Sequence, residues 1–401
     1  MLSQRIQTLS SSMTIAITTL ALELKAEGKD ILSFSPGEPD FDTPQAIKES
    51  AKKAIDNGQT RYTAIPGTPE LLKAVAGKLK RDNNLEYSTK QIQTNNGAKH
   101  SLFNLFQALI DDGDEVIIPS PYWVTYPEVV KYSGGKAIII ETDDTTGFKI
   151  TPQQLKDAIT DKTKALILTT PSNPTGAVYS KEELEGLAEV LKGTDVLVIS
   201  DEMYEKLVYD GIKFTATASI SNDMFQRTIT VNGLSKSAAM TGWRFGYLAT
   251  ANTELVAVMN KLQSQSTSNI SSITQAAAIT GLDGTIDVVV EEMRVEFQTR
   301  RDEAVESINK IDGLSVASPD GAFYLFINIK GVTNDSMEFA KRLLEEEGVA
   351  IIPGIAFGSE GYIRFSFATN IENIREGIKR IERFIKDNYT PHMSDMIKIE
   401  N

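Results

Sequence analysis

Residues 165–199 read ALILTTPSNPTGAVYSKEELEGLAEVLKGTDVLVI. Two short apolar runs, Ala165 to Leu168 and Val196 to Ile199, flank a turn signal and a helical pattern. Apolar runs of this length are typical of strands buried on both faces, and the segment between them is long enough for a helix. The stretch therefore predicts a strand–helix–strand unit, which is the building block of a parallel sheet covered by helices.

The same alternation of helical patterns and apolar runs extends from about residue 45 to residue 250. The other clear runs are Glu115 to Pro119, Ala137 to Ile140, Thr228 to Val231 and Phe245 to Ala249. We therefore expect residues 46–283 to form a large α/β domain, with a mostly parallel sheet between helices.

The pattern changes after residue 283, where one long charged helix is expected over residues 286–311. Strand and helix signals then follow in an order typical of an α+β unit. We expect a smaller domain that combines the N-terminal segment, residues 1–45, with the C-terminal part, residues 284–401. The later elements expected in it are strands at Ala322 to Ile329 and Tyr362 to Phe367, and helices at Ser336 to Glu347 and Ile371 to Lys386.

Composition excludes several classes of function. The net charge of −13 argues against nucleic-acid binding, which needs clustered Lys and Arg. The absence of cysteine excludes disulfides and thiolate nucleophiles, and with only two histidines, His100 and His392, we expect no metal site. The apolar segment from Met13 to Leu24 is too short to span a bilayer and lacks the features of a signal peptide. We expect a cytoplasmic protein that does not bind membranes.

Polar residues of unusual kinds follow three of the strongest apolar runs. In an open α/β sheet, ligands bind beyond the carboxyl ends of the strands, so side chains that follow parallel strands can converge on one site. The residues in question are Asn173, Asp201, Tyr204, Ser235, Lys236 and, slightly later, Arg244.

This set of residue types suits pyridoxal phosphate. A partly buried lysine has a lowered pKa and can attack a carbonyl group as an amine. An aspartate beside a pyridine nitrogen keeps that nitrogen protonated, and Tyr and Asn can donate hydrogen bonds to a ring oxygen. Arg and Ser can hold a phosphate, as can the N-terminus of a helix, which is expected after the glycine turn within residues 94–106.

Each residue also has a simpler interpretation, and the residues alone leave both open. Taken in isolation, Asn173-Pro174 is better read as a turn, and Asp201-Glu202 as the acidic pair at a helix N-terminus. Lys236 alone would be an ordinary solvated lysine. Arg364 lies between Ile363 and Phe365 in an apolar strand pattern, so it needs an anionic partner, either a structural carboxylate or a substrate.

Four motifs resemble the class I aminotransferases of fold type I, most of all the bacterial-type (subgroup Ib) aspartate aminotransferases. They are PSNPTG (171–176), SDEMYEKLVY (200–209), SKSAAMTGWRFGY (235–247) and YIRFS (362–366). The resemblance covers the chain from about Leu9 to Phe384, with the motifs in the order typical of the family.

The resemblance implies a role for each cofactor-site residue. Lys236 is implied to carry pyridoxal phosphate as a Schiff base and to move the proton at Cα, while Asp201 pairs with the pyridinium nitrogen. Tyr204 and Asn173 are implied to donate to the ring oxygen, and Trp123 to stack on the ring. The implied phosphate-binding residues are Gly97, Ala98, Ser235, Arg244 and, from the neighbouring subunit of a homodimer, Tyr62. Lys99, in the same motif, is implied to be a further cofactor-binding residue.

The resemblance also implies how substrates bind. Arg364 would hold the α-carboxylate of an amino acid, with Gly37, Trp123 and Asn173 beside the substrate, and Lys99 would recognise a distal carboxylate. The implied reaction converts L-aspartate and 2-oxoglutarate to oxaloacetate and L-glutamate. The alternatives are a broad or aromatic aminotransferase, a β-eliminating lyase and a cofactor-binding regulator without turnover.

The sequence departs from the family pattern at two places. Ala98 stands where a second glycine is common, which leaves the turn intact only if residue 98 does not need a positive φ. Residues 10–12 are SSS where Lys-Pro-Ser is common, which argues against activity on larger dicarboxylates such as prephenate. No function is assigned to the polar tail, residues 389–401.

Overall fold

The computed structural model describes residues 2–10 and 13–389 of the chain. It divides into two compact units. The first comprises residues 2–10, Glu38–Glu296 and Asp320–Ala322, and the second comprises residues 13–37, Phe297–Pro319 and residues 323–389. The expected domain limits, residues 46–283 against 1–45 and 284–401, stay a prediction. Residues 11–12 of the SSS segment, His392 and the tail from residue 390 lie outside the described residues.

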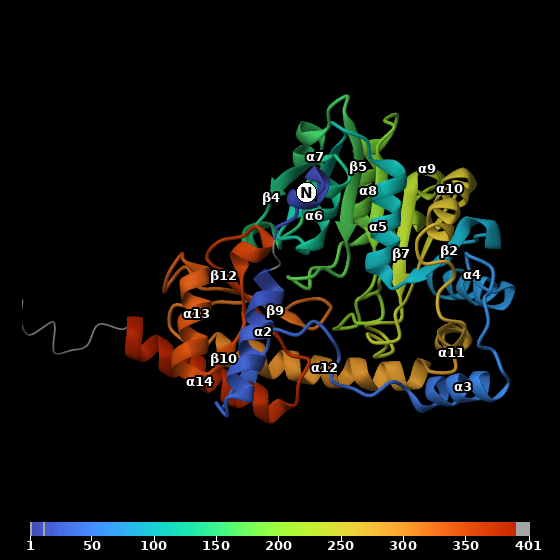
Figure 1. Cartoon of the computed structure of the whole chain (residues 1–401). Helices are drawn as coiled ribbons and strands as arrows, with labels where there is room; N and C mark the ends of the chain where they lie inside the picture. The colour runs from blue at the N-terminus through green and yellow to red at the C-terminus, as the bar shows by residue number, and fades with distance from the viewer. Residues whose placement is uncertain (1, 11–12, 390–401) are drawn as a thin grey trace, which may run out of the picture. The chain divides into compact units, whose positions relative to one another are not determined.

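The first unit contains a seven-stranded sheet with the strand order β2-β8-β7-β6-β5-β3-β4 (Figure 1). All neighbouring pairs from β7 to β4 are parallel, whereas β8 runs antiparallel to both β7 and β2. The predicted mostly parallel sheet is therefore confirmed. The strands are β2 (Ile92–Asn96), β3 (Glu115–Ser120), β4 (Lys136–Glu141), β5 (Thr163–Thr169), β6 (Leu197–Asp201), β7 (Thr228–Gly233) and β8 (Phe245–Thr250).

Six of these strands coincide with the apolar runs, and one was not expected. The strand β2, which reads IQTNN, is mostly polar, yet Gln93, Thr94 and Asn95 are buried in it. Their side chains are satisfied by partners elsewhere in the unit: Asn95 Nδ2 donates to Gln263 Oε1 over 2.6 Å, and Gln93 Nε2 donates to Asn260 Oδ1 over 2.9 Å. A polar strand of this kind gives no apolar run in the sequence.

Helices cover both faces of the sheet. On one face, Leu166 and Leu168 of β5 pack with Leu184 and Leu187 of α8. On the other face, Thr169 of β5 contacts α6. The helices of this unit are α1 (Gln4–Gln7), α3 (Gln45–Asp56), α4 (Pro69–Asn83), α5 (Ala98–Leu109), α6 (Thr125–Tyr132), α7 (Pro152–Ala158), α8 (Lys181–Leu191), α9 (Asn222–Arg227), α10 (Thr253–Ser264) and α11 (Ser272–Leu282), while α12 (Asp287–Ile308) contributes residues to both units.

The second unit is an α+β unit, as expected. Its three-stranded antiparallel sheet has the order β11-β12-β9, and the short strands β1 and β10 pair in parallel. The helix α13 begins where Asp335 accepts a hydrogen bond from the Glu338 N–H, and it ends at Gly348 with a φ of 67°. The elements are α2 (Met13–Ala26), β1 (Leu32–Ser33), β9 (Tyr324–Asn328), α13 (Ser336–Glu347), β10 (Val349–Ala350), β11 (Ile352–Pro353), β12 (Tyr362–Ser366) and α14 (Ile371–Tyr389).

Over residues 2–10 and 13–389, no single helix has the length and hydropathy needed to cross a membrane. The helices α11 and α12 meet this requirement only as a pair, and the pair is bent by 78°.

Candidate active site

The predicted polar residues of the first unit follow strands that end together. Thr169 of β5 lies beside Asp201, the last residue of β6, and Asp201 lies beside Val231 of β7. The segments that follow these three strands therefore begin at the same edge of the sheet. No helix begins at Asp201, because a turn follows β6. The interpretation of Asp201-Glu202 as a helix N-terminal pair is wrong.

Asp201 is a buried carboxyl group held in place by hydrogen bonds. Its side chain is 4% exposed. The Tyr126 hydroxyl donates to Asp201 Oδ2 over 2.7 Å, and the Met203 N–H donates to Oδ1 over 3.3 Å. Burial raises the pKa of Asp201 to about 6, although these two hydrogen bonds and the positive charge of Lys236 act in the opposite direction. The carboxylate is thus poised to ionise close to neutral pH.

Tyr126 is a residue that the sequence analysis missed. It lies near the start of α6, it is fully buried, and its hydroxyl also contacts Thr169 Oγ1 at 2.8 Å. Burial, together with the charge of Asp201, raises the pKa of Tyr126 well above its ordinary value, so the hydroxyl keeps its proton. The available signal was an aromatic residue three positions after Trp123 at the start of a helical pattern, but that signal says nothing about a contact with Asp201.

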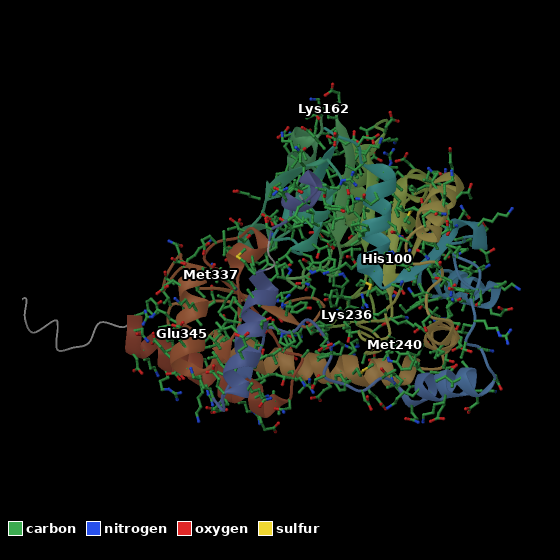
Figure 2. All side chains as sticks on the ribbon, in the orientation of Figure 1. His100, Lys162, Lys236, Met240, Met337 and Glu345 are labelled. Carbon is green, nitrogen blue, oxygen red and sulfur yellow. The ribbon has the colours of Figure 1, made fainter. Side chains whose placement is uncertain are left out.

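Lys236 lies in the turn that follows β7 and is half-buried (Figure 2). Its positive charge acts on Asp201, so the two groups lie near each other. Ser235 precedes it and is buried, and Asn173 and Tyr204, which follow β5 and β6, are buried as well. Lys236 is therefore not the solvated surface lysine of the simpler interpretation.

The N-terminus of α5 forms a close contact with Arg244. Gly97 precedes the helix with a φ of 82°, and a Cβ there would lie 2.9 Å from the Arg244 Cζ. A Cβ at Gly246 of β8 would lie 2.9 Å from the Ala98 Cα, so both glycines are required for this approach. Arg244 Nη1 donates to the Thr241 carbonyl over 2.8 Å. A guanidinium beside helix N–H groups is an arrangement suited to a phosphate.

Ala98 is compatible with this arrangement. It is the first residue of α5, and it is not among the residues with a positive φ, whereas Gly97 is. The condition under which alanine leaves the turn intact is therefore met.

Lys99 and Trp123 connect this cradle to Asp201. The Lys99 Nζ lies 4.9 Å from the centre of the Trp123 ring, and that ring meets the Tyr126 ring edge-on, with centres 5.5 Å apart. Burial, followed by the charge of Arg244, lowers the pKa of Lys99. A series of contacts thus runs from Lys99 through Trp123 and Tyr126 to Asp201, and the charge of Arg244 acts on Lys99.

Arg364 and Gly37 belong to the second unit. Arg364 on β12 is 4% exposed, and its Nη2 donates to the Ser35 carbonyl over 2.7 Å. Its guanidinium lies 4.5 Å from the centre of the Tyr324 ring. A Cβ at Gly37 would lie 2.8 Å from the Tyr324 hydroxyl, so the loop before residue 38 requires glycine at this point.

All of the predicted cofactor-site residues belong to the first unit, and those that follow β5, β6 and β7 lie in segments that begin at the same edge of the sheet. Tyr62 differs from the buried site residues, because its side chain is 91% exposed. Chemically, the site offers an amine on Lys236, an acid poised to ionise on Asp201 and an anion cradle at Gly97 and Arg244. Such a set fits a ring that has a basic nitrogen, an attached carbonyl and a phosphate. The individual roles of these residues stay predictions.

Comparison with known proteins gives one consistent result. The family described as aminotransferase class I and II matches residues 29–381. The aspartate aminotransferase of Bacillus subtilis (strain 168) is 47% identical, over 96% of this chain and 99% of that protein. The aspartate/prephenate aminotransferase of Cereibacter sphaeroides is 45% identical, over 96% and 98%. The solved structure of Thermus thermophilus aspartate aminotransferase with maleate is 41% identical, with a TM-score of 0.92 over 96% of this chain and 99% of that one.

Proposed function

We propose that this chain, which belongs to the class I and II aminotransferases, uses pyridoxal phosphate to convert L-aspartate and 2-oxoglutarate to oxaloacetate and L-glutamate. The family's reaction is the transfer of an amino group from an amino acid to a 2-oxo acid. The observation that carries this proposal is the buried Asp201, held by Tyr126 and acted on by the charge of Lys236 at the end of the parallel strands. A protonated ring nitrogen needs such an anion.

The cofactor residues are proposed as follows. When bound, pyridoxal phosphate supplies an electron sink that stabilises negative charge on the amino-acid Cα. Lys236 would hold the cofactor through its amine and would move the proton at the substrate Cα. Asp201 holds the ring nitrogen protonated. Tyr204 and Asn173 donate to the ring oxygen, and Trp123 covers the ring face. The proposed phosphate ligands are Gly97, Ala98, Ser235 and Arg244, and Lys99, next to Ala98 on α5, is a further proposed cofactor-binding residue.

The substrate residues are proposed on chemical grounds. Arg364 binds the α-carboxylate through its planar fork of donors, with Gly37, Asn173 and Trp123 beside the substrate. Lys99 binds the distal carboxylate. Two features support aspartate as the substrate: the names of the similar proteins, and the structure from Thermus thermophilus that contains maleate, a four-carbon dicarboxylate. The alternative is a broad or aromatic aminotransferase.

The assembly is proposed to be a homodimer, in which Tyr62 reaches the phosphate site of the neighbouring subunit. The support is its exposed fraction of 91% in the single chain, which is unusual for a tyrosine. A cytoplasmic location also stays a prediction.

The experiment that tests the proposed function is an absorbance spectrum of the purified protein, before and after L-aspartate is added. We expect a cofactor band that shifts to the shorter wavelength of the pyridoxamine form. A band that responds to phenylalanine and not to aspartate would favour the aromatic alternative. Release of ammonia and pyruvate would identify a lyase instead. If no band forms even when pyridoxal phosphate is supplied, the proposed cofactor is wrong.

Replacing Lys99 with Ala tests the proposed substrate. The change removes a charged hydrogen-bond donor to the distal carboxylate, so kcat/KM for aspartate and glutamate is expected to fall about 10- to 100-fold. Turnover of phenylalanine, which lacks that carboxylate, is expected to change much less. The exposed Lys162→Ala serves as the control. The role of Lys99 is refuted if aspartate turnover is kept while phenylalanine turnover falls.

Replacing Tyr126 with Phe tests whether the Tyr126 hydroxyl stabilises the Asp201 carboxylate. The change removes the hydrogen bond to Asp201 Oδ2 while it keeps the ring that packs against Trp123. A hydrogen bond to a charged group contributes about 1.5–3 kcal/mol, so cofactor affinity is expected to fall about 10- to 100-fold. The pKa of Asp201 is expected to rise, because this hydrogen bond lowers it. Equilibrium titration of the apoprotein with pyridoxal phosphate gives the affinity, and an unchanged value would show that Tyr126 has a packing role alone.

A further inference from the structure

Glu202 follows Asp201 at the end of β6, and it occupies the opposite face of the sheet. The Glu202 N–H donates to the Val231 carbonyl over 2.9 Å, so the extended pairing with β7 continues through this residue. Successive side chains of an extended strand point to opposite faces. Asp201 accordingly meets Tyr126 of α6, whereas Glu202 accepts a hydrogen bond from the Thr217 N–H over 3.1 Å.

The Glu202 side chain is only half satisfied. It is 0% exposed. Both of its hydrogen bonds, from Ser200 Oγ over 2.8 Å and from the Thr217 N–H, go to Oε1. Across the described part of the chain, Oε2 has no hydrogen-bond partner. A fully buried carboxylate with no counter-ion, and with one oxygen that receives no hydrogen bond, is strongly unfavourable. The usual outcome is that such a group keeps its proton.

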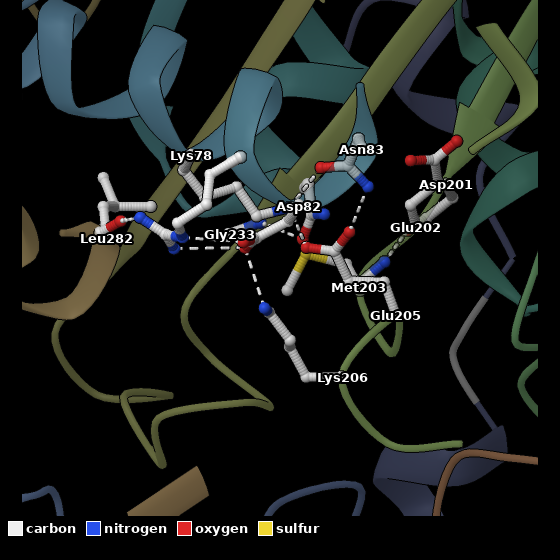
Figure 3. A network of polar contacts seen from close by, with 12 residues as sticks. Lys78, Asp82, Asn83, Asp201, Glu202, Met203, Glu205, Lys206, Gly233 and Leu282 are labelled. Atoms are coloured by element: carbon white, nitrogen blue, oxygen red, sulfur yellow. Dashed lines mark hydrogen bonds and ion pairs between the residues drawn. The ribbon is translucent and has the colours of Figure 1, made fainter. Parts of the chain in front are cut away.

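The nearby cations are engaged with other acids. Lys78 of α4 forms an ion pair with Glu205 and donates to Asn83 Oδ1 over 2.7 Å (Figure 3). Asn83 Nδ2 donates to Glu205 Oε2 over 2.7 Å, which completes a closed, buried set of contacts. Lys206 pairs with Asp82 at 2.7 Å. Glu205 thus has the counter-ion that Glu202 lacks.

The titratable groups packed around Glu202 come from α4, the segment before β2, the turn after β6, and β8. Burial, followed by the charge of Glu205, raises the pKa of Glu202 to about 8, although Ser200, Thr217 and Lys78 lower it. The hydroxyl of Tyr247 is buried without a hydrogen-bond partner within the described residues, and burial, followed by the charges of Glu205 and Glu202, raises its pKa. The titratable groups that interact with Glu202 are Lys78, Tyr87, Glu205 and Tyr247. Arg81, Asp82 and Lys206 line one pocket together with Lys78, Glu205 and Tyr247.

We propose that Glu202 is a positioning residue that keeps its proton at neutral pH, so that the Asp201–Glu202 pair carries one negative charge, on Asp201. The proposal rests on the proposed function in one respect, the need for an ionised Asp201 beside the cofactor ring. Neighbouring ionised carboxylates raise each other's pKa. A charged Glu202 would therefore favour protonation of Asp201, whereas a neutral Glu202 leaves Asp201 free to ionise.

The first test is the thermal stability of Glu202→Gln. The amide keeps the oxygen that accepts from Ser200 and Thr217, and it imitates the protonated acid. In the wild type, the pKa of Glu202 is raised from its ordinary 4.5 to about 8, so between these values the folded protein holds a proton that the unfolded chain has lost. The contribution of Glu202 to the free energy of unfolding of the wild type therefore decreases as the pH rises from 4.5 to about 8, and it is constant above that pH. The melting temperature of the variant relative to the wild type should rise from about pH 5 to about pH 8.

The matched control is Glu205→Gln, which is the same change three residues away in the same network. Glu205 is the ion-pair partner of Lys78, so this variant leaves a buried charge unpaired. It is expected to melt below the wild type at every pH from about 6 to 8. If Glu202→Gln behaved in this way too, or if its advantage shrank as the pH rose, Glu202 would be charged and the proposal would be overturned.

Two further measurements keep the proposal testable if a variant fails to fold. The infrared spectrum of the wild-type holoenzyme at neutral pH should contain the carbonyl band of a buried protonated carboxyl group that is lost at alkaline pH, and its absence would refute the proposal. The pH midpoint of pyridoxal phosphate binding should be unchanged in Glu202→Gln. If Glu202 were ionised in the wild type, its replacement would remove a negative charge near Asp201 and lower that pH midpoint by about one unit or more. A wild type that bound no cofactor would refute the proposed function and leave the stability result intact.

Discussion

Replacing Lys236 with Ala is expected to abolish transamination. Lys236 is the half-buried amine whose charge acts on Asp201, and in the proposed function it both holds the cofactor and moves the Cα proton. General acid–base catalysis alone contributes up to about 10⁴-fold, so the rate of the half-reaction should fall by at least that factor. The fold should persist, because the change shortens a side chain in a turn and leaves the flanking strands β7 and β8 intact.

The measurement is the loss of the Cα hydrogen of L-aspartate to solvent deuterium, which reports proton transfer directly. Reduction with borohydride followed by peptide mapping should place the cofactor on Lys236 in the wild type and on no residue of Lys236→Ala. The exposed Lys162→Ala is the control, and it should exchange at the wild-type rate. Exchange at more than a hundredth of the wild-type rate in Lys236→Ala would mean that another base acts at the Cα.

Replacing Asp201 with Asn is expected to have the second largest effect. The amide is nearly the same shape and still accepts from Tyr126, but it has no charge to keep a ring nitrogen protonated. Loss of one partner of a buried charge pair costs about 3–5 kcal/mol, which corresponds to a decrease of roughly 10²- to 10⁴-fold in the half-reaction. Asp195, an exposed acid just before β6, provides the matched control Asp195→Asn.

The same carboxyl group predicts a dependence on pH. The pKa of Asp201 in the folded protein is raised from its ordinary 3.8 to about 6, so the free site loses its negative charge as the pH falls through about 6. The affinity of the apoprotein for pyridoxal phosphate should therefore fall by up to about tenfold per pH unit below 6. Asp201→Asn should bind weakly with no such step. A wild-type titration that stays flat between about pH 7 and 5 would contradict the role of Asp201.

Much of this architecture was predictable because its signals are local. The buried parallel strands β5 and β6 are apolar on both faces, so they stand out as continuous runs in the sequence. Asp201 and Lys236 could be singled out because polar residues directly after such runs lie at the carboxyl edge of the sheet. Those residues lie close together because β5, β6 and β7 are neighbouring parallel strands that end at the same edge of the sheet.

Other features depend on partners that are distant in the sequence. The strand β2 is polar, and it is stable in the interior because Gln263 and Asn260 of α10 satisfy its amide side chains. Tyr126 and Asp201 are separated by 75 positions, and no spacing rule relates them. The pattern alone showed neither contact, because hydrogen-bond satisfaction of a buried group is a property of the packed structure.

The sequence by itself determined the fold class, the family resemblance and the identity of the candidate catalytic groups, since hydrophobic periodicity and motif order are written along the chain. Only the tertiary structure decided the electrostatic state of those groups. Two adjacent acids, Asp201 and Glu202, look equivalent in sequence, yet Asp201 accepts a hydrogen bond from Tyr126. Glu202 is instead affected by the charges of Lys78 and Glu205, an ion pair whose members are 127 positions apart in the sequence. The reason is physical: the pKa of a carboxyl group depends on the burial and charges around it in space.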